Sequence, residues 1–66
     1  MNDFGQKIET LRMAQNATCA EAASILGIPQ SRLREIEKGI RVPTEGQVKR
    51  MEDYYGVKPG DLSALI

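Results

Sequence analysis

Two short helical patterns in the middle of the chain are separated by only a few residues, and this spacing is the strongest constraint on the fold. The first pattern spans about residues 19–26, and Thr18 and Glu21 before and within it have the spacing of a capping box. Gly27 can end this helix, because glycine adopts a positive φ at little cost. The second pattern spans about residues 29–38. So short a connection forces the two helices to cross at a steep angle.

The rest of the chain predicts a small all-α fold around this pair. Apolar side chains recur at helical spacing in about residues 3–15, from residue 44 onward and at the C-terminal end. The 66 residues suffice for one small domain. We therefore expect a single domain over residues 1–66, a compact bundle of five short helices. It has a central helix-turn-helix at about residues 18–38 and a C-terminal helix at about residues 59–66.

The residue types that are missing exclude several classes of protein. The chain has one cysteine, Cys19, and no histidine, so a disulfide framework, a Cys/His zinc site and His-assisted nucleophilic catalysis are excluded. We expect no enzymatic activity, no metal, no cofactor and no small-molecule ligand. No apolar run approaches the ~18 residues of a membrane span, and the N-terminus lacks the pattern of a secretory signal. A cytoplasmic location without membrane contact is expected.

Charged side chains balance over the whole chain but are unevenly distributed. Nine basic and nine acidic residues give a net charge of zero, whereas a DNA-binding domain is expected to carry a basic surface. Residues 30–50 nevertheless carry a local excess of three positive charges, and their field is the part of the chain that favours a polyanion. The basic residues of this segment are Arg32, Arg34, Lys38, Arg41, Lys49 and Arg50, against Glu35, Glu37 and Glu45.

The central segment carries a specific motif. Residues 26–31 (LGIPQS) and 36–39 (IEKG) are followed shortly by an arginine and a proline. With this motif the chain resembles the Cro/C1-type helix-turn-helix family of prokaryotic and phage transcriptional regulators, over about residues 4–65. Two positions depart from the family pattern, which usually has a glutamine at Cys19 and a larger apolar residue at Ala22. The resemblance implies a fold of the lambda repressor type that binds double-stranded DNA.

The second helix of the pair is the predicted recognition helix. Leu33 and Ile36 point inward at helical spacing, which leaves a polar face outward. Glutamine can pair with adenine, arginine with guanine and glutamate with the cytosine amino group, and serine accepts several partners. The alternative is a polar face that only contacts solvent. The resemblance favours base contacts, and the residues it implies for them are Gln30, Ser31, Arg34 and Glu35.

A second set of residues is predicted to bind phosphates, which position a protein on DNA without determining sequence preference. Thr18 and the free amides at its helix start can meet an anion, although Thr18 and Thr44 can equally serve only as helix caps. Cys19 at the same helix start is either a reactive thiolate or a small residue tolerated there. Arg32 lies on the flank of its helix, facing phosphate or Glu35. The phosphate candidates are Thr18, Cys19, Arg32, Lys38, Arg41 and Thr44.

One charged pair is predicted to be structural. The resemblance pairs Arg12 of the first helix with Glu37 of the recognition helix. A half-buried pair would brace these helices, and the loss of one partner would cost roughly 3–5 kcal/mol. The alternative is an exposed pair worth less than about 1 kcal/mol.

The C-terminal residues suggest a homodimer. Leu62, Leu65 and Ile66 are a large apolar share of so short a segment, and with Tyr54 they are expected to form a two-fold interface. The alternative is that they only close the core of the monomer. In a dimer, two recognition helices about 34 Å apart would suit an inverted-repeat DNA site.

The expected function is therefore sequence-specific regulation of transcription. A chain this short leaves no room for an effector domain, which favours repression by occlusion or control of its own promoter. The alternative is a protein-interaction module of the same fold, such as an antitoxin or anti-repressor. Zero net charge and Glu35 on the predicted recognition face favour that alternative. Salt dependence separates the two, because phosphate binding weakens steeply with salt.

Overall fold

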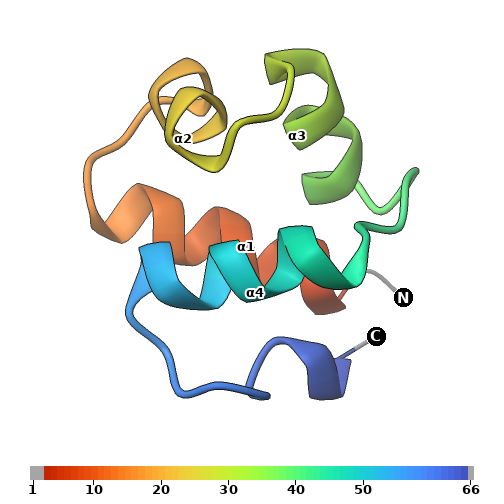
Figure 1. The fold of residues 1–66 in the computed structure, drawn as a ribbon. Helices are drawn as coiled ribbons and strands as arrows, with labels where there is room; N and C mark the ends of the chain where they lie inside the picture. Colours follow the sequence, from red (N-terminus) through yellow and green to blue (C-terminus); the bar gives the residue numbers. More distant parts are fainter. Residues whose placement is uncertain (1–2, 66) are drawn as a thin grey trace.

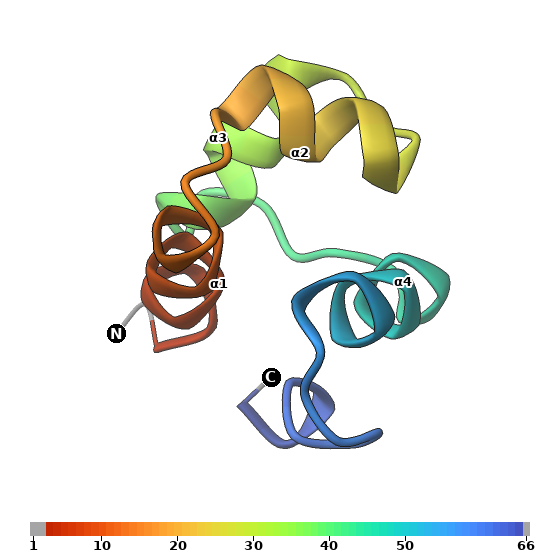
Figure 2. The same ribbon diagram turned by 90° about the vertical axis from the view of Figure 1, so that its left-hand side faces the viewer.

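The computed structural model describes residues 3–65 as an all-helical fold without strands in this range. Its elements are α1 (Asp3–Ala14), α2 (Cys19–Leu26), α3 (Gln30–Glu37), α4 (Glu45–Tyr55) and the 3-10 turn η1 (Ser63–Leu65). α2 and α3 lie together at the top of Figure 1, with α1 and α4 beneath them. In the side view of Figure 2, α1 and α4 lie apart from each other, and the C-terminal turn lies below α4. Both α2 and α1 pack against α3 and α4.

Side chains at the helix starts explain where α2 and α4 begin. The Thr18 hydroxyl accepts a hydrogen bond from the Glu21 amide at 3.1 Å, and the Glu21 carboxylate accepts one from the Thr18 amide at 2.9 Å. Thr44 and Gln47 form the same reciprocal pair at 3.2 and 3.0 Å. Each capping box satisfies two amides that lack a partner in the first turn. The capping box predicted for Thr18 and Glu21 is confirmed, and Thr44 is a helix cap as expected.

The core lies where the four helices meet. Its fully buried large side chains come from α1, α3, α4 and the segment before η1. Segments from both ends and the middle of the chain therefore contribute to one core. α2 contributes two small residues, Ala22 and Ala23, and the larger Leu26 to the core. The largest fully buried side chains are Ile8, Leu33, Ile36, Met51 and Leu62.

The prediction of five helices is wrong at the C-terminal end. Four α-helices are present in the described range, and the segment expected to form a fifth contains only the 3-10 turn η1. Gly60 has φ +95°, which is outside the α-helical region. The amides of Gly60, Leu62 and Ser63 all donate to one carboxylate oxygen of Glu52, which fixes the segment in a turn.

No helix in the described range is both long and apolar enough to span a membrane.

Candidate nucleic-acid interface

The turn between α2 and α3 sets the position of α3. Gly27 adopts φ +74°, and the Ile28 amide donates to the Ala23 carbonyl at 3.0 Å to close the helix end. Pro29 then forms the N-cap of α3 with an extended backbone, one residue before the helix that was expected to include it. Leu33 is fully buried beneath this turn. The burial of one face of α3 holds the opposite face outward.

Three of the four predicted base-contacting residues lie on that outward face. Gln30, Ser31 and Arg34 are exposed. Their side chains form no hydrogen bond or ion pair with any other residue of the described range. Polar groups without internal partners are available to the edges of bases or to solvent.

The fourth predicted base-contacting residue, Glu35, is engaged with another candidate. Nε of Arg41 donates to Oε1 of Glu35 at 2.9 Å. The pair remains accessible, with exposed side-chain fractions of 48% for Arg41 and 40% for Glu35. The structure thus brings together a residue predicted to contact bases and one predicted to contact phosphate.

The predicted phosphate contacts surround α3 on two sides. Thr18 and Thr44 are exposed, and both hydroxyls serve as helix caps. Arg32 is half-buried on the flank of α3. It does not pair with Glu35, whose ion-pair partner is Arg41. The Cys19 thiol lies 3.8 Å from the Gln30 carbonyl oxygen and so links the starts of the two helices.

A shallow pocket lies between the start of α2 and the end of α3. Arg34 and Lys38 contribute cationic groups to it, and neither forms an ion pair within residues 3–65. Glu9 stands on the α1 side of the same pocket. An anion bound here would be attracted by Arg34 and Lys38 and repelled by Glu9. The lining residues are Glu9, Arg12, Cys19, Arg34, Glu37 and Lys38.

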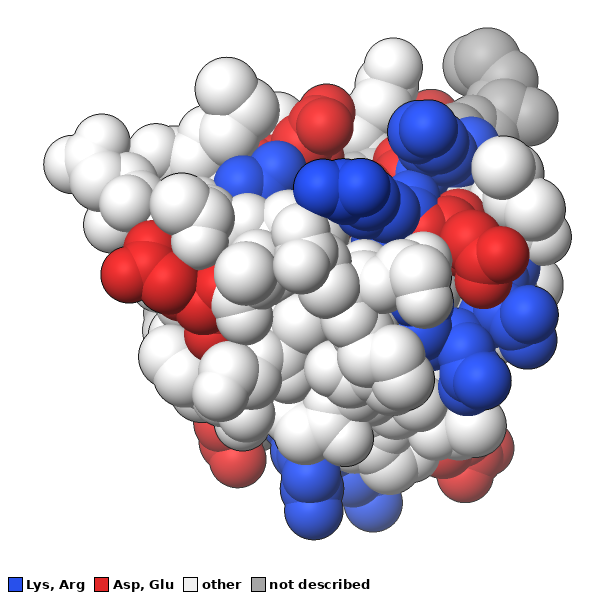
Figure 3. All heavy atoms as spheres, turned by 90° about the horizontal axis from the view of Figure 1, so that it is seen from above, with Lys and Arg blue, Asp and Glu red and all other residues white. Residues whose placement is uncertain are grey.

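The face that carries α2 and α3 is unevenly charged. Figure 3 shows this face from above, with most basic side chains on the right-hand half, where α3 lies, and acidic groups interspersed among them. The part over α2 is largely uncharged. The local excess of positive charge predicted for residues 30–50 includes Arg34, Lys38 and Arg41, which are exposed on α3 or shortly after it.

Comparison with known families agrees with this geometry. The family described as "Helix-turn-helix domain" matches residues 3–65 of the chain. The chain belongs to this helix-turn-helix family. The family is part of the Cro/C1-like group of helix-turn-helix domains, which confirms the resemblance found in the residues. No curated protein and no solved structure matches the chain.

In this helix-turn-helix domain α1 and α3 are joined by the predicted charged pair. Nε and Nη2 of Arg12 donate to the two carboxylate oxygens of Glu37 at 2.8 and 3.2 Å. The side chains are only 14% and 5% exposed. Nη1 of Arg12 also donates to the Ala17 carbonyl at 2.9 Å. The hydrogen bond and charge of Glu37 raise the pKa of Arg12, although burial acts against them.

Two charged residues that support the helix-turn-helix are absent from the sequence-based predictions. Nη1 of Arg50 donates to the Leu26 carbonyl at 3.2 Å and so caps the C-terminal end of α2. Glu52 is buried and holds the C-terminal turn. The helical wheel places Glu52 beside the apolar stripe of α4, which is a usable signal. Nothing in the local sequence marks Arg50, because its partner is a carbonyl group 24 residues away.

The predicted dimer residues do not form one patch. Leu62 is fully buried in the monomer, so it offers no surface to a second copy, and this part of the prediction is wrong. Tyr54 lines a hollow between α2 and α4 together with Ile25. Leu65 is 41% exposed on η1, which Figure 1 places beneath the other end of α4. Ile66 lies outside the described residues.

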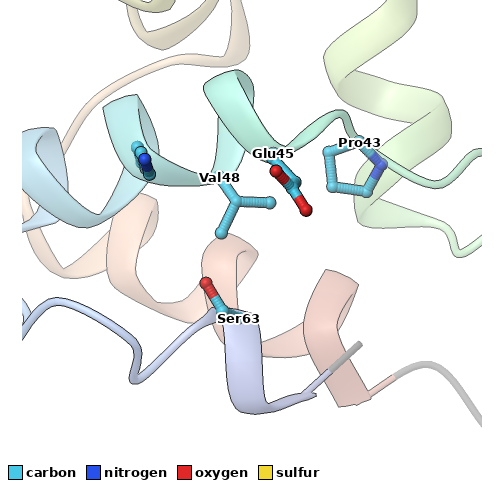
Figure 4. Close-up of a pocket in the computed structure, with 5 residues that line it drawn as sticks. Pro43, Glu45, Val48 and Ser63 are labelled. Carbon is cyan, nitrogen blue, oxygen red and sulfur yellow. The ribbon is translucent and has the colours of Figure 1, made fainter.

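A second shallow groove lies between the start of α4 and the C-terminal turn. Figure 4 shows Val48 of α4 facing Ser63 across it, with Glu45 and Pro43 at one end. Lys49 completes the lining. The groove is shallow and mixed in polarity.

Within residues 3–65 no group of Cys, Asp and Glu could hold a metal ion.

Proposed function

We propose that this helix-turn-helix domain is a sequence-specific, double-stranded-DNA-binding regulator of transcription. The observation that carries the proposal is the outward face of α3, where Gln30, Ser31 and Arg34 are exposed and have no partner within residues 3–65. An α-helix fits the major groove of B-DNA, and these side-chain types match base edges there. Gln30 and Ser31 stand at the start of α3, which suits a recognition helix, whose N-terminal residues contact bases.

The flanks of α3 support the same proposal. Lys38 and Arg41 follow the helix and are exposed, which leaves both cations open to DNA phosphates. Contacts of this kind fix the register of a helix in the groove. The hydroxyl oxygens of Thr18 and Thr44 accept hydrogen bonds from helix amides, and the same hydroxyl groups can still donate to a phosphate. Arg32 and Cys19 complete the proposed set at the edges of the surface.

The regulatory outcome that we propose is repression or control of the chain's own promoter. A domain bound in the major groove of a promoter prevents polymerase from occupying the same base pairs. Repression therefore needs no contact beyond DNA binding. Activation would require a further surface that contacts polymerase.

We propose that two copies bind an inverted repeat. Leu65 is an exposed apolar residue on the turn that borders the groove containing Val48 and Pro43. A two-fold contact there would cover Leu65 and place two α3 helices on one side of the DNA. Sedimentation of the wild type and of Leu65→Glu tests this contact. We expect the variant to shift toward the monomer, whereas an unchanged distribution would remove Leu65 from the interface.

Selection from a pool of random duplexes tests the function itself. We expect enrichment of a specific motif, arranged as an inverted repeat if the dimer binds. A pool without enrichment would contradict sequence-specific binding. It would favour the second candidate, a protein-interaction module of the same fold, which the zero net charge also favours.

A further inference from the structure

We infer that Glu35 positions Arg41 for a DNA phosphate and does not itself contact a base. The inference rests on the proposed DNA-binding function and changes the role of one residue within it. It also makes the loop after α3 part of the DNA-binding surface. Three structural observations carry it: the contacts of Glu35, the free part of the Arg41 guanidinium, and the accessibility of the pair.

Glu35 holds the loop after α3 at two points. Its carboxylate accepts the Arg41 Nε–H at 2.9 Å. Its main-chain carbonyl accepts the amides of Ile40 at 2.9 Å and of Arg41 at 3.3 Å. Both the backbone and the side chain of Arg41 are therefore fixed relative to α3. The hydrogen bond at Oε1 also holds the Glu35 side chain toward Arg41 and the loop after α3.

The contact with Glu35 leaves the end of Arg41 available. Only Nε takes part in the ion pair, and no other hydrogen bond of the Arg41 side chain occurs within residues 3–65. The two terminal Nη groups can therefore form the paired, parallel hydrogen bonds that suit a phosphate. Arginine fixed at Nε loses less freedom on binding than an unrestrained side chain.

The surroundings of the pair favour a surface role. Ile40 and Val42 on either side of Arg41 are each 72% exposed, so the loop segment projects away from the core. The two charged side chains are themselves about half exposed. An exposed pair contributes little to folding stability. Substitutions at Glu35 and Arg41 are therefore expected to leave the fold intact, which circular dichroism can verify.

A double-mutant cycle on DNA binding tests the inference. The variants are Glu35→Gln, Arg41→Ala and the double variant, titrated against the selected duplex and a shuffled duplex over a range of salt. Glu45→Gln is the matched control, because it removes one exposed negative charge that has no ion pair within residues 3–65. Removal of a negative charge alone should strengthen binding to DNA.

We expect Arg41→Ala to weaken binding on both duplexes and to reduce the salt slope by about one. Glu35→Gln should weaken binding on both duplexes by roughly 2- to 10-fold, opposite to the Glu45→Gln control. It should have no further effect in the Arg41→Ala background. This coupling and the change in salt slope separate a positioning role from a general effect on structure.

Two results would overturn the inference while leaving DNA binding intact. If Glu35→Gln strengthens binding as the control does, the Glu35 carboxylate only offsets the positive charge of Arg41 that would attract DNA. If its effect is confined to one base pair and persists in the Arg41→Ala background, Glu35 contacts that base. A wild type that binds neither duplex would instead overturn the proposed function, and this inference with it.

Discussion

The guanidinium of Arg50 occupies the space that a side chain at Gly27 would need. A Cβ atom at Gly27 would lie 2.8 Å from Nη1 of Arg50, the atom that also donates to the Leu26 carbonyl. Gly27 has φ +74°, a conformation that costs an L-residue roughly 1–2 kcal/mol. The backbone conformation of this turn thus favours glycine, and a side chain here would also displace the Arg50 guanidinium from the Leu26 carbonyl.

Gly27→Ala should therefore be more destabilising than the same change at another helix end. Gly56 is the matched control, because it has φ +71° but nothing within 4 Å of its Cβ position. We expect Gly56→Ala to show the cost of the backbone conformation alone, and Gly27→Ala to lose the Arg50 contact as well, a hydrogen bond worth about 1 kcal/mol. Urea unfolding measures both. Equal losses would show that Arg50 moves aside freely.

Arg12→Ala should destabilise the fold by roughly 3–5 kcal/mol, because it removes the arginine that neutralises a buried carboxylate. Glu37 is only 5% exposed, so solvent cannot replace the lost partner well. Arg41→Ala is the matched control, since its exposed ion pair should be worth less than about 1 kcal/mol. Thermal unfolding gives the comparison. If the two variants melt alike, the buried pair does not brace α1 against α3.

Because Arg12→Ala could prevent folding altogether, Arg12→Met with Glu37→Leu provides a second measurement. Replacement of a buried ion pair by apolar residues of similar size is often tolerated. We expect this double variant to be more stable than Arg12→Ala. A double variant less stable than Arg12→Ala would assign the loss to packing.

Glu52→Gln should lower stability at neutral pH, and its effect should fade in acid. Burial alone would raise the pKa of Glu52, but hydrogen bonds from the amides of Ser63, Leu62 and Gly60 outweigh it and lower the pKa below its ordinary value. A lowered pKa in the folded state means that the carboxylate stabilises the fold fully above the unfolded value. This contribution is lost as pH falls through the folded value.

Melting temperatures of the wild type and Glu52→Gln from pH 7 to pH 3 test this dependence, over a range chosen from the ordinary pKa of a carboxyl group near ~4.3. We expect the difference in melting temperature between the two proteins to be constant near neutral pH. It should shrink as the pH falls below the ordinary pKa of a carboxyl group. Exposed Asp53→Asn is the control for a change of net charge. A gap that persists unchanged to pH 3 would mean that the negative charge of Glu52 is not what holds the C-terminal turn.

Tyr55→Phe should leave stability unchanged or raise it by up to about 1 kcal/mol. The Tyr55 hydroxyl is buried and has no hydrogen-bond partner within residues 3–65. A buried polar group without a partner costs roughly 1–3 kcal/mol, and phenylalanine removes it while keeping the ring. Burial raises the pKa of Tyr55, so its hydroxyl stays protonated. A fall in melting temperature of several degrees would contradict this account.

Gln30→Ala should reduce discrimination between DNA sequences more than it reduces overall binding. A bidentate base contact contributes about 1–3 kcal/mol of discrimination. Lys38→Ala is the comparison, because a phosphate contact should weaken binding to all sequences alike. Titration against the selected duplex and its single-base variants separates these patterns. A uniform loss with Gln30→Ala would remove Gln30 from the base-contacting set.

Local sequence patterns predict the part of the fold that depends on local chemistry. The capping residues Thr18 and Thr44 lie within three positions of their partners, and Gly27 ends α2 by its own conformation. The helix-turn-helix follows from such short-range rules. Which residues of α3 touch DNA stays a prediction, because exposure shows only that a side chain is available.

The C-terminal end was not predictable in the same way. Apolar residues at helical spacing suggest a fifth helix, but the backbone from Gly60 onward is fixed by a carboxylate on another helix. The contacts of Glu52 with Gly60 and of Arg50 with Leu26 join segments that are 8 and 24 residues apart. The engagement of Glu35 with Arg41 is missed for a related reason, since it depends on the path of the loop after α3.

Salt dependence of binding tests the central claim, that this chain is a sequence-specific DNA-binding domain, most directly. Fluorescence anisotropy would follow the purified protein on the selected duplex and on a shuffled duplex of equal length, at several salt concentrations. We predict tighter binding to the selected duplex at every salt concentration, with affinity falling steeply as salt rises. Equal affinity for both duplexes, or binding that salt does not change, would contradict the claim.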